Sequence, residues 1–318
     1  MNKKYYIVND EIFKSLNFIH LLLSIIRGII LNRGVDYVTK IFKKNKILIP
    51  LSAVALMILS SLIEVILLLV APESLISSTV PKIIFSTTIK FIMSAIFIFI
   101  ILKLYKLKIG FGKKSLVKGI FWFGSMLCIA SMFNFLGGYQ NPEISFIQAL
   151  PMIIMFLVFA LSVGLYEEIV FRGFIFSLFR KYFGESKKGI YTSVLLSALI
   201  FGCVHFLNLI VYPELIITTI AQVISASFVG VLFAVIYFRT ENLLPCIILH
   251  TIFDFAGYFW FSFAKDIDKM MNVANTTDTN IGAGIINIAL CSLFVISGLL
   301  QLRKVFKNKK LNSIEDKR

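Results

Sequence analysis

Acidic residues, histidine and cysteine are scarce in this chain. Its 318 residues contain 17 Asp and Glu against 32 Lys and Arg, with three histidines and four cysteines. Each cysteine stands alone in an apolar segment without a Cys-x-x-Cys pair, which argues against a disulfide framework. The sequence also lacks the H-E-x-x-H and G-x-S-x-G motifs, which mark many zinc-dependent and serine-dependent active sites. Any catalytic chemistry must therefore rely on few ionisable side chains.

The shortage of acids leaves a formal net charge of +15 at pH 7. The basic residues lie in short loops between apolar segments, and no nucleic-acid-binding motif accompanies them, so we expect no nucleic-acid partner. Membrane proteins concentrate Lys and Arg in cytoplasmic loops, where these residues also meet anionic lipids. The positive charge therefore indicates contact with a lipid bilayer.

Hydrophobic residues make up 58 % of the chain, and several runs of about 20 apolar residues are long enough to cross a bilayer as helices. We predict an all-α, polytopic membrane bundle of about eight transmembrane helices. They are expected at residues 47–71, 83–102, 119–138, 146–168, 190–211, 215–238, 243–263 and 281–302. The fourth helix is expected to continue towards Phe183.

Residues 12–31 carry a polar stripe at helical spacing and lack the cleavage site of a signal peptide. This pattern predicts an interfacial amphipathic helix, with a short extra span as the alternative.

Clusters of Lys and Arg alternate along the chain with loops that carry few bases. The basic clusters lie at residues 40–46, 103–118, 180–188, 239 and 303–310. The base-poor loops lie at residues 72–81, 139–145, 212–214 and 264–280. The positive-inside rule then places both termini in the cytoplasm and residues 264–280 outside the cell. We expect a multi-pass protein of the cell membrane, and the abundance of Lys, Ile and Asn suits a bacterial plasma membrane.

The predicted spans contain ionisable side chains, which are costly in hydrocarbon and are therefore candidates for a functional site. Glu167 and Glu168 are adjacent in the fourth span and point about 100° apart on a helix, so we expect them to have different roles. Glu168 and Arg172 are four residues apart and face each other, which predicts a structural ion pair. Glu167 has no base at i+3 or i+4, and such a carboxylate suits general-base chemistry.

His205 lies in the fifth span, as far from the turn near residue 186 as Glu167 is, which predicts a similar depth in the membrane. Glu167 and His205 together can hold and deprotonate water, or they can ligate a metal. His250 and Asp254 are four residues apart in the seventh span, where the carboxylate can orient the imidazole and the imidazole N–H can stabilise an oxyanion. Each residue alone also has a packing explanation, but their coincidence in depth indicates a hydrolase built within the bilayer.

Two further ionisable residues, Glu64 and Lys90 in the first two spans, could pair with each other, and a packing role is favoured over a part in a proton path.

The same residues resemble the CPBP family, which comprises CAAX prenyl proteases and bacteriocin-processing enzymes and is also called the Abi family. Its motifs Glu-Glu-x-x-x-Arg, Phe-x-x-x-His and His-x-x-x-Asn/Asp are similar to Glu167–Arg172, Phe201–His205 and His250–Asp254, in that order within about residues 148–258. The resemblance implies an intramembrane endopeptidase in which Glu167 and His205 activate water and His250 with Asp254 forms the oxyanion site. Glu168 and Arg172 give structural support.

The resemblance leaves metal dependence open, because family members have been described both as metalloproteases and as glutamate proteases. If the chain is metal-dependent, Glu167, His205 and His250 are the expected ligands, for an ion such as zinc. We favour a reaction without a cofactor, because an anionic Glu and a neutral His suffice to activate water.

The resemblance also divides the chain. We expect a cytoplasmic N-terminus at 1–46, N-terminal transmembrane helices at 47–145, the catalytic core at 146–263, and an outer loop, last span and basic tail at 264–318. The expected partners are a peptide or membrane-protein substrate and the bilayer, in peptide or bacteriocin maturation or in self-immunity. The alternative is a non-proteolytic membrane immunity or regulatory scaffold of the same family. A transporter is a third reading, but the inverted repeats and broken helices that it predicts are not evident.

Overall fold

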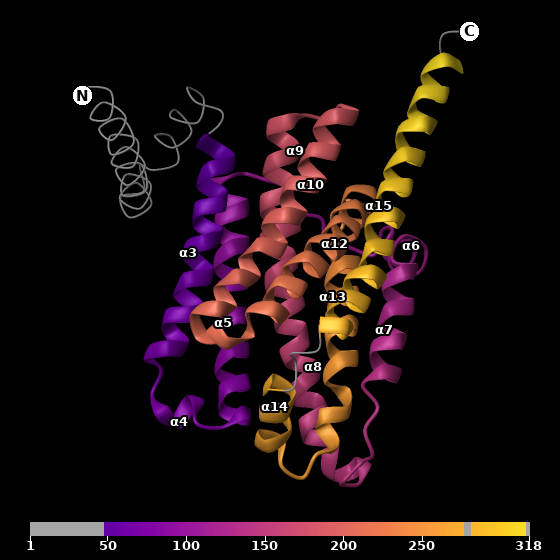
Figure 1. Cartoon of the computed structure of the whole chain (residues 1–318). Coiled ribbons are helices and arrows are strands. Elements are labelled where there is room, and N and C mark those ends of the chain that lie inside the picture. Colours follow the sequence, from indigo (N-terminus) through magenta and orange to yellow (C-terminus); the bar gives the residue numbers. More distant parts are fainter. Residues whose placement is uncertain (1–47, 277–280, 316–318) are drawn as a thin grey trace, which may run out of the picture. The chain divides into compact units, whose positions relative to one another are not determined.

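The computed structural model describes residues 48–276 and 281–315, and within these ranges all regular secondary structure is helical. The α-helices are α3 (Leu48–Val70), α4 (Glu73–Ile76), α5 (Thr79–Phe99), α6 (Leu116–Lys118), α7 (Ser125–Gly137), α8 (Phe146–Glu168), α9 (Ser177–Phe183), α10 (Lys187–Cys203), α11 (Asn208–Val211), α12 (Ile216–Thr240), α13 (Leu244–Tyr258), α14 (Ile267–Thr276) and α15 (Ile281–Glu315) (Figure 1). The amphipathic helix predicted at residues 12–31 lies outside the described residues.

Short π- and 3₁₀-helical segments extend several of these helices. The π segments are η1 (Ile100–Leu104), η2 (Gly119–Phe123) and η3 (Ile169–Phe176). The 3₁₀ segments are η4 (Val204–Leu207), η5 (Pro213–Leu215) and η6 (Phe259–Phe263). The chain divides into two compact units, residues 1–56 and 57–318, and the packing and the site described below lie within the second unit.

Among the described residues, seven helices are long and apolar enough to cross a membrane, and an eighth span is added if one bent pair is counted as a single crossing. The prediction of an all-α polytopic bundle with about eight spans is confirmed. The fourth span continues as helix to Phe183, also as predicted. The third span differs from the straight helix expected at 119–138, because Leu116–Phe123 and Ser125–Gly137 meet at 66°. Gly124 lies at the bend, and glycine is a common cause of helix kinks.

The loop predicted at residues 264–280 contains an unpredicted helix, α14. Asp266 begins it, because its Oδ1 accepts a hydrogen bond from the Lys269 backbone N–H at 2.9 Å, as an N-cap residue does. Asp268 Oδ1 in turn accepts from the backbone N–H of Thr79 at 2.5 Å, which joins α14 to the first turn of α5. Hydrogen bonding from the Thr79 side chain and backbone lowers the pKa of the Asp268 carboxyl.

Helix α12 is the most enclosed span, with 67 % of its most apolar stretch buried, against at most 39 % in the others. It packs against α10 and α15, while α8 packs against α5 and α13 (Figure 1). Gly164 permits a close approach of α8 to α13, because a Cβ there would lie 3.0 Å from Thr251 Oγ1 and 3.2 Å from the Ile247 carbonyl oxygen. This contact lies one turn before Glu167 and beside His250. It therefore sets the distance between the acidic pair at the end of α8 and the His250–Asp254 motif on α13.

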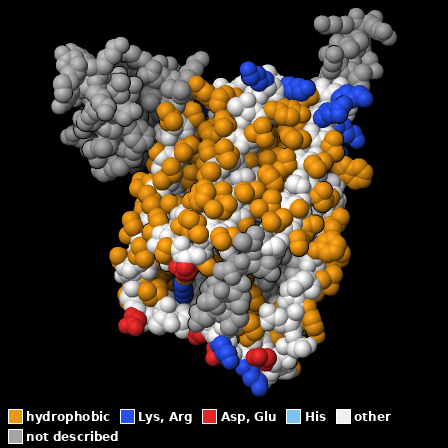
Figure 2. All heavy atoms as spheres, in the orientation of Figure 1, with side chains coloured by type: hydrophobic (Ala, Val, Ile, Leu, Met, Phe, Trp, Pro, Cys, Tyr) orange, Lys and Arg blue, Asp and Glu red, His pale blue; other side chains and the backbone are white. Residues whose placement is uncertain are grey.

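Apolar side chains cover the middle of the face shown in Figure 2, Lys and Arg lie at both ends of it, and acids appear towards the lower end. The apolar band is what a lipid-facing surface requires. The cytoplasmic location of both termini stays a prediction.

Candidate active site

The two glutamates stand at the end of α8, where the helix changes its hydrogen-bond pattern. Helix α8 ends at Glu168 and the chain continues without interruption through the π segment η3, whose eight residues Ile169–Phe176 are all buried. Segments of π-helix inside α-helices are rare and often lie at functional sites. The fourth span therefore carries its acidic pair at the entry to a fully enclosed stretch of chain.

A buried ion pair between Arg172 and Glu168 supports His250. Arg172 Nη1 lies 2.9 Å from Glu168 Oε1, and the two side chains are 2 % and 0 % exposed. The same Glu168 oxygen lies 2.8 Å from His250 Nδ1. Because a carboxylate paired with a guanidinium accepts hydrogen bonds, Nδ1–H donates to Glu168 and the ring is held in one orientation.

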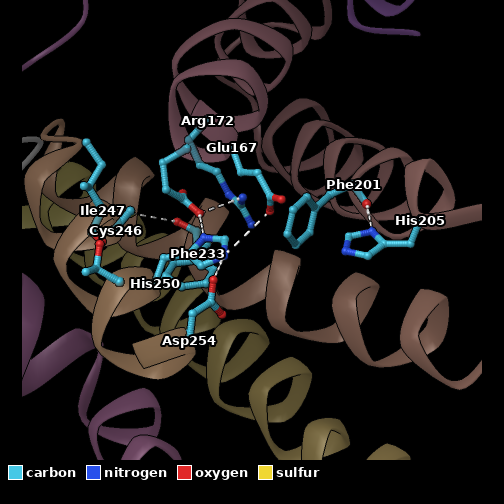
Figure 3. Close-up of polar contacts among 11 residues, drawn as sticks. Glu167, Arg172, Phe201, His205, Phe233, Cys246, Ile247, His250 and Asp254 are labelled. Carbon is cyan, nitrogen blue, oxygen red and sulfur yellow. Dashed lines mark hydrogen bonds and ion pairs between the residues drawn. The ribbon is translucent and has the colours of Figure 1, made fainter. Parts of the chain in front are cut away.

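The other nitrogen of the same ring faces two carboxylates. His250 Nε2 lies 3.6 Å from Glu167 Oε2 and 3.5 Å from Asp254 Oδ2. These separations are longer than a direct hydrogen bond but lie within ion-pair distance of a protonated imidazole. Figure 3 shows Glu167 and Asp254 approaching the imidazole from α8 and α13. Glu167 and Glu168 thus contact opposite sides of His250, as their different directions on the helix predict.

Two phenylalanines form the walls of the cluster. The His250 ring stacks on Phe233, with centroids 5.3 Å apart and planes at 19°. The Arg172 guanidinium lies 4.4 Å from the centre of the Phe201 ring and 4.9 Å from that of Phe233. The rings therefore hold the cation in an apolar environment, where cation–π attraction is strongest.

His205 lies on the far side of Phe201. The Phe201 ring is edge-on to both histidines, with centroids 5.6 Å from His205 and 6.3 Å from His250 (Figure 3). His205 is in η4, where its Nδ1 lies 3.1 Å from the carbonyl oxygen of Phe201. Because a carbonyl only accepts, Nδ1–H is the donor in this contact.

A cavity of about 1290 Å³ joins these side chains. Glu167, His205, His250 and Asp254 all line it, whereas Glu168 and Arg172 are not among its lining residues. The wall continues over apolar side chains of α3, α12 and α15 and over many polar ones. The polar side chains away from the glutamate–histidine cluster are Ser61, Glu64, Lys82, Lys90, Asn208, Tyr212, Thr218, Gln222, Ser225 and Asn287.

The geometry differs from the sequence-based expectation in two respects. Asp254 was expected to orient His250, but Glu168 makes the short contact with Nδ1 and Asp254 faces Nε2. His205 was expected beside Glu167, yet in the described chain no ion pair joins them and Phe201 lies between the two histidines. Equal depth fixes the level of two side chains, but the rotation of each helix decides what they touch.

The predicted ion pairs are present. Glu168 pairs with Arg172, and Glu64 pairs with Lys90. The sequence does not predict the contact of Glu168 with His250, although the position of Glu168 beside a candidate base is a usable signal. Phe201 stands out in the sequence only as part of its motif, and nothing there indicates Phe233.

The conditional metal ligands do not converge. Across residues 48–276 and 281–315, the structure contains no group of three or more His, Cys, Asp or Glu side chains placed to hold a metal ion. His205 is separated from the other two candidates, Glu167 and His250, by the Phe201 ring. The set of ligands offered by the sequence therefore does not fit a metal in this geometry.

Comparison with known proteins identifies the part of the chain that carries the cluster. A family model described as type II CAAX prenyl endopeptidase Rce1-like matches residues 148–256. Neither the curated proteins nor the solved structures give a significant match. The matched residues include Glu167, His205, His250 and Asp254, and they lie in a chain with seven or eight candidate membrane spans. Residues 148–256 therefore form an Rce1-like domain of the type II CAAX prenyl endopeptidases, a family of membrane hydrolases, within a multi-pass membrane protein.

Proposed function

We propose that the chain is an endopeptidase that cleaves peptide or protein substrates at or within the bilayer, with water activated by Glu167 and His205. One observation carries this proposal. The side chains able to act as base and as oxyanion donor line one cavity, whereas the ion pair that supports them is buried behind it. A purely structural cluster would have no reason to divide in this way.

In the proposed reaction, the Glu167 carboxylate takes a proton from a water molecule as the water oxygen bonds to the scissile carbonyl carbon. His250, held by Glu168 on its other side, donates an N–H to the oxyanion that forms. The carbon–nitrogen bond then breaks, and the proton passes from Glu167 to the leaving amine. Asp254 stabilises the charge on His250 from the cavity side.

His205 offers a free Nε2 from the opposite side of Phe201. A substrate group or a short chain of waters must link it to Glu167, so its part in water activation requires an occupied cavity. We propose that the reaction belongs to bacterial peptide maturation or self-immunity. A membrane protein whose cavity can hold a peptide fits either role.

Comparative peptidomics of membranes that contain the wild type or Glu167→Gln tests the proposal. Loss of a general base slows a reaction about a hundredfold or more, so peptides cleaved by the wild type should accumulate uncut in the variant. Glu73→Gln is the matched control, because it makes the same change of charge at an exposed position outside the cavity. His205→Ala should resemble Glu167→Gln.

Equal peptide profiles in the wild type and Glu167→Gln would refute the proposed chemistry. If an immunity phenotype also survived Glu167→Gln, the protein would act as a non-proteolytic scaffold. Both variants must first be shown to reach the membrane in wild-type amounts.

A further inference from the structure

Two cations share one aromatic ring at a place outside the glutamate–histidine cavity. The guanidinium carbon of Arg239 lies 3.7 Å from the centre of the buried Phe123 ring, and Lys118 Nζ lies 5.7 Å from the same centre. None of these three residues lines the cavity. Within the described chain neither cation forms an ion pair, whereas Arg180 on α9 has two carboxylate partners.

Gln301 on α15 fixes the half-buried guanidinium but occupies only one of its donors. Arg239 Nη1 donates to Gln301 Oε1 at 3.1 Å, and Gln301 Nε2 donates to the Phe123 carbonyl oxygen at 2.9 Å. A guanidinium has five N–H donors. None of the Arg239 nitrogens is among the buried polar atoms that lack a partner, so its remaining donors reach the surface. Lys118 is exposed and adds the three donors of an ammonium.

Close packing of η2 against the end of α12 brings the two cations to the same ring. A Cβ at Gly119 would lie 2.6 Å from Pro245 Cγ and 3.0 Å from Thr240 Cγ2, so glycine permits this approach. Lys118 directly precedes that glycine, and Arg239 directly precedes Thr240. Like charges that face one ring repel each other, and an anion that contacts both of them would offset the repulsion.

The surroundings of Lys118 and Arg239 favour a phospholipid as the source of that anion. Arg239 is one residue from the end of the candidate span Pro213–Thr240, where a helix leaves the hydrocarbon. Basic pockets between membrane helices bind anionic headgroups at this level. Exposed apolar side chains, of the kind that meet lipid at an interface, flank Lys118 along the chain. They are Val117, Phe121 and Trp122, with exposures of 69 %, 68 % and 69 %.

We propose that Arg239 and Lys118 bind the phosphate of an anionic phospholipid, whose acyl chains lie along Phe121 and Trp122. A guanidinium can hold two phosphate oxygens at once, and a lysine adds a point charge. A zwitterionic headgroup fits less well, because its ammonium would approach the same two cations. The site is separate from the cavity, so this inference does not depend on the proposed function.

Tryptophan fluorescence can report on this site, because the chain has only two tryptophans, Trp122 and Trp260. Full-length protein carrying Trp260→Phe is reconstituted into vesicles of phosphatidylcholine and phosphatidylglycerol. One lipid at a time carries brominated acyl chains, which quench a neighbouring indole. Quenching across a series of mixtures gives the binding constant of phosphatidylglycerol relative to phosphatidylcholine beside Trp122. The companion protein with Trp122→Phe reports on lipid beside Trp260, in η6.

Three variants of the site and one control are compared in the Trp260→Phe protein. Arg239→Gln and Lys118→Met each remove one charge, and Arg239→Lys keeps the charge but not the planar fork. Lys188→Met is the matched control, because Lys188 is an exposed lysine on α10 and is not one of the cations over Phe123.

We expect phosphatidylglycerol to be preferred beside Trp122. Arg239→Gln and Lys118→Met should each lower the relative binding constant about fivefold, the effect of one Lys or Arg near an anionic surface. Arg239→Lys should keep most of the preference, and Lys188→Met should keep all of it. The relative binding constant beside Trp260 should not respond to changes at Arg239 or Lys118.

Equal binding of the two lipids beside Trp122 would overturn the site. A preference that Lys118→Met leaves unchanged would do so as well, and because Lys118 is exposed this variant stays informative even if Arg239→Gln lowers the yield of protein. A loss that Lys188→Met reproduces would indicate diffuse surface charge and refute a defined site. Inorganic phosphate is added against chloride of equal ionic strength. If phosphate alone abolished the preference, the site would bind a dissolved anion and the lipid assignment would be wrong.

Discussion

Replacing Arg172 with Met should destabilise the folded protein strongly. Arg172 is 2 % exposed and its partner Glu168 is 0 % exposed, at 2.9 Å. Loss of one member of a buried pair leaves an uncompensated charge and costs about 3–5 kcal/mol. The guanidinium also lies against the rings of Phe201 and Phe233, and a desolvated cation–π contact is worth about 2 kcal/mol. Because these contributions are not additive, we take about 3–5 kcal/mol as the expected loss.

Equilibrium unfolding in a mild detergent, followed by tryptophan fluorescence, measures the effect. The double variant Glu168→Gln/Arg172→Met should recover most of the loss, because a neutral amide needs no counter-charge and its oxygen still accepts from His250 Nδ1–H. Arg180→Met is the matched control, since its partners Glu185 and Glu241 are 58 % and 59 % exposed and such a pair contributes about 1 kcal/mol or less. If the free energy of unfolding of Arg172→Met lay within about 1 kcal/mol of the wild type, the expected cost of leaving the Glu168 charge buried and unpaired would be refuted.

Two further predictions concern the end of the bundle that carries α14. Lys269→Cys, at an exposed position on α14, should react with an impermeant thiol reagent added outside the cell. Labelling only after lysis would show that α14 lies in the cytoplasm, opposite to the predicted topology. The hydrogen bond from Thr79 to Asp268 should be present above the ordinary carboxyl pKa of 3.8 and be lost as the pH falls through the lowered pKa of Asp268, because a depressed pKa stabilises the fold only while the group is ionised. Hydrogen exchange at the Thr79 amide, corrected for its intrinsic rate, should rise over that range, and in Asp268→Ala it should be fast at every pH. Slow exchange in Asp268→Ala would contradict the assignment.

The spans and the level of the site could be predicted because both depend on distance along the chain. Apolar length gives the crossings, and i,i+4 spacing gives the Glu168–Arg172 pair and places Asp254 one turn from His250. The contact of Glu168 with His250 joins residues 82 apart. It depends on how α8 and α13 are rotated about their axes, which spacing within one helix does not determine.

Apolar length alone does not reveal several other features. Helix α14 has 10 residues, too few to cross a membrane, and its signal is instead the helical spacing of its polar and apolar residues. The bend between η2 and α7 interrupts a continuous apolar run, and hydropathy alone cannot show it. Lys118, Arg239 and Gln301 come together from α6, α12 and α15, and each resembles an ordinary polar residue near the end of a span.

The π segment that follows Glu168 has a consequence for which changes this chain can accommodate. A π turn holds an extra residue relative to an α turn, so η3 fixes the phase between the acidic pair on α8 and the basic end of α9. Removing one residue from Ile169–Phe176 can be taken up by conversion of a π turn into an α turn, which keeps Arg180 near Glu241. Inserting one residue has no such outlet and would rotate all that follows by about 100°. Deletions of a single residue through η3 should therefore be tolerated better than insertions.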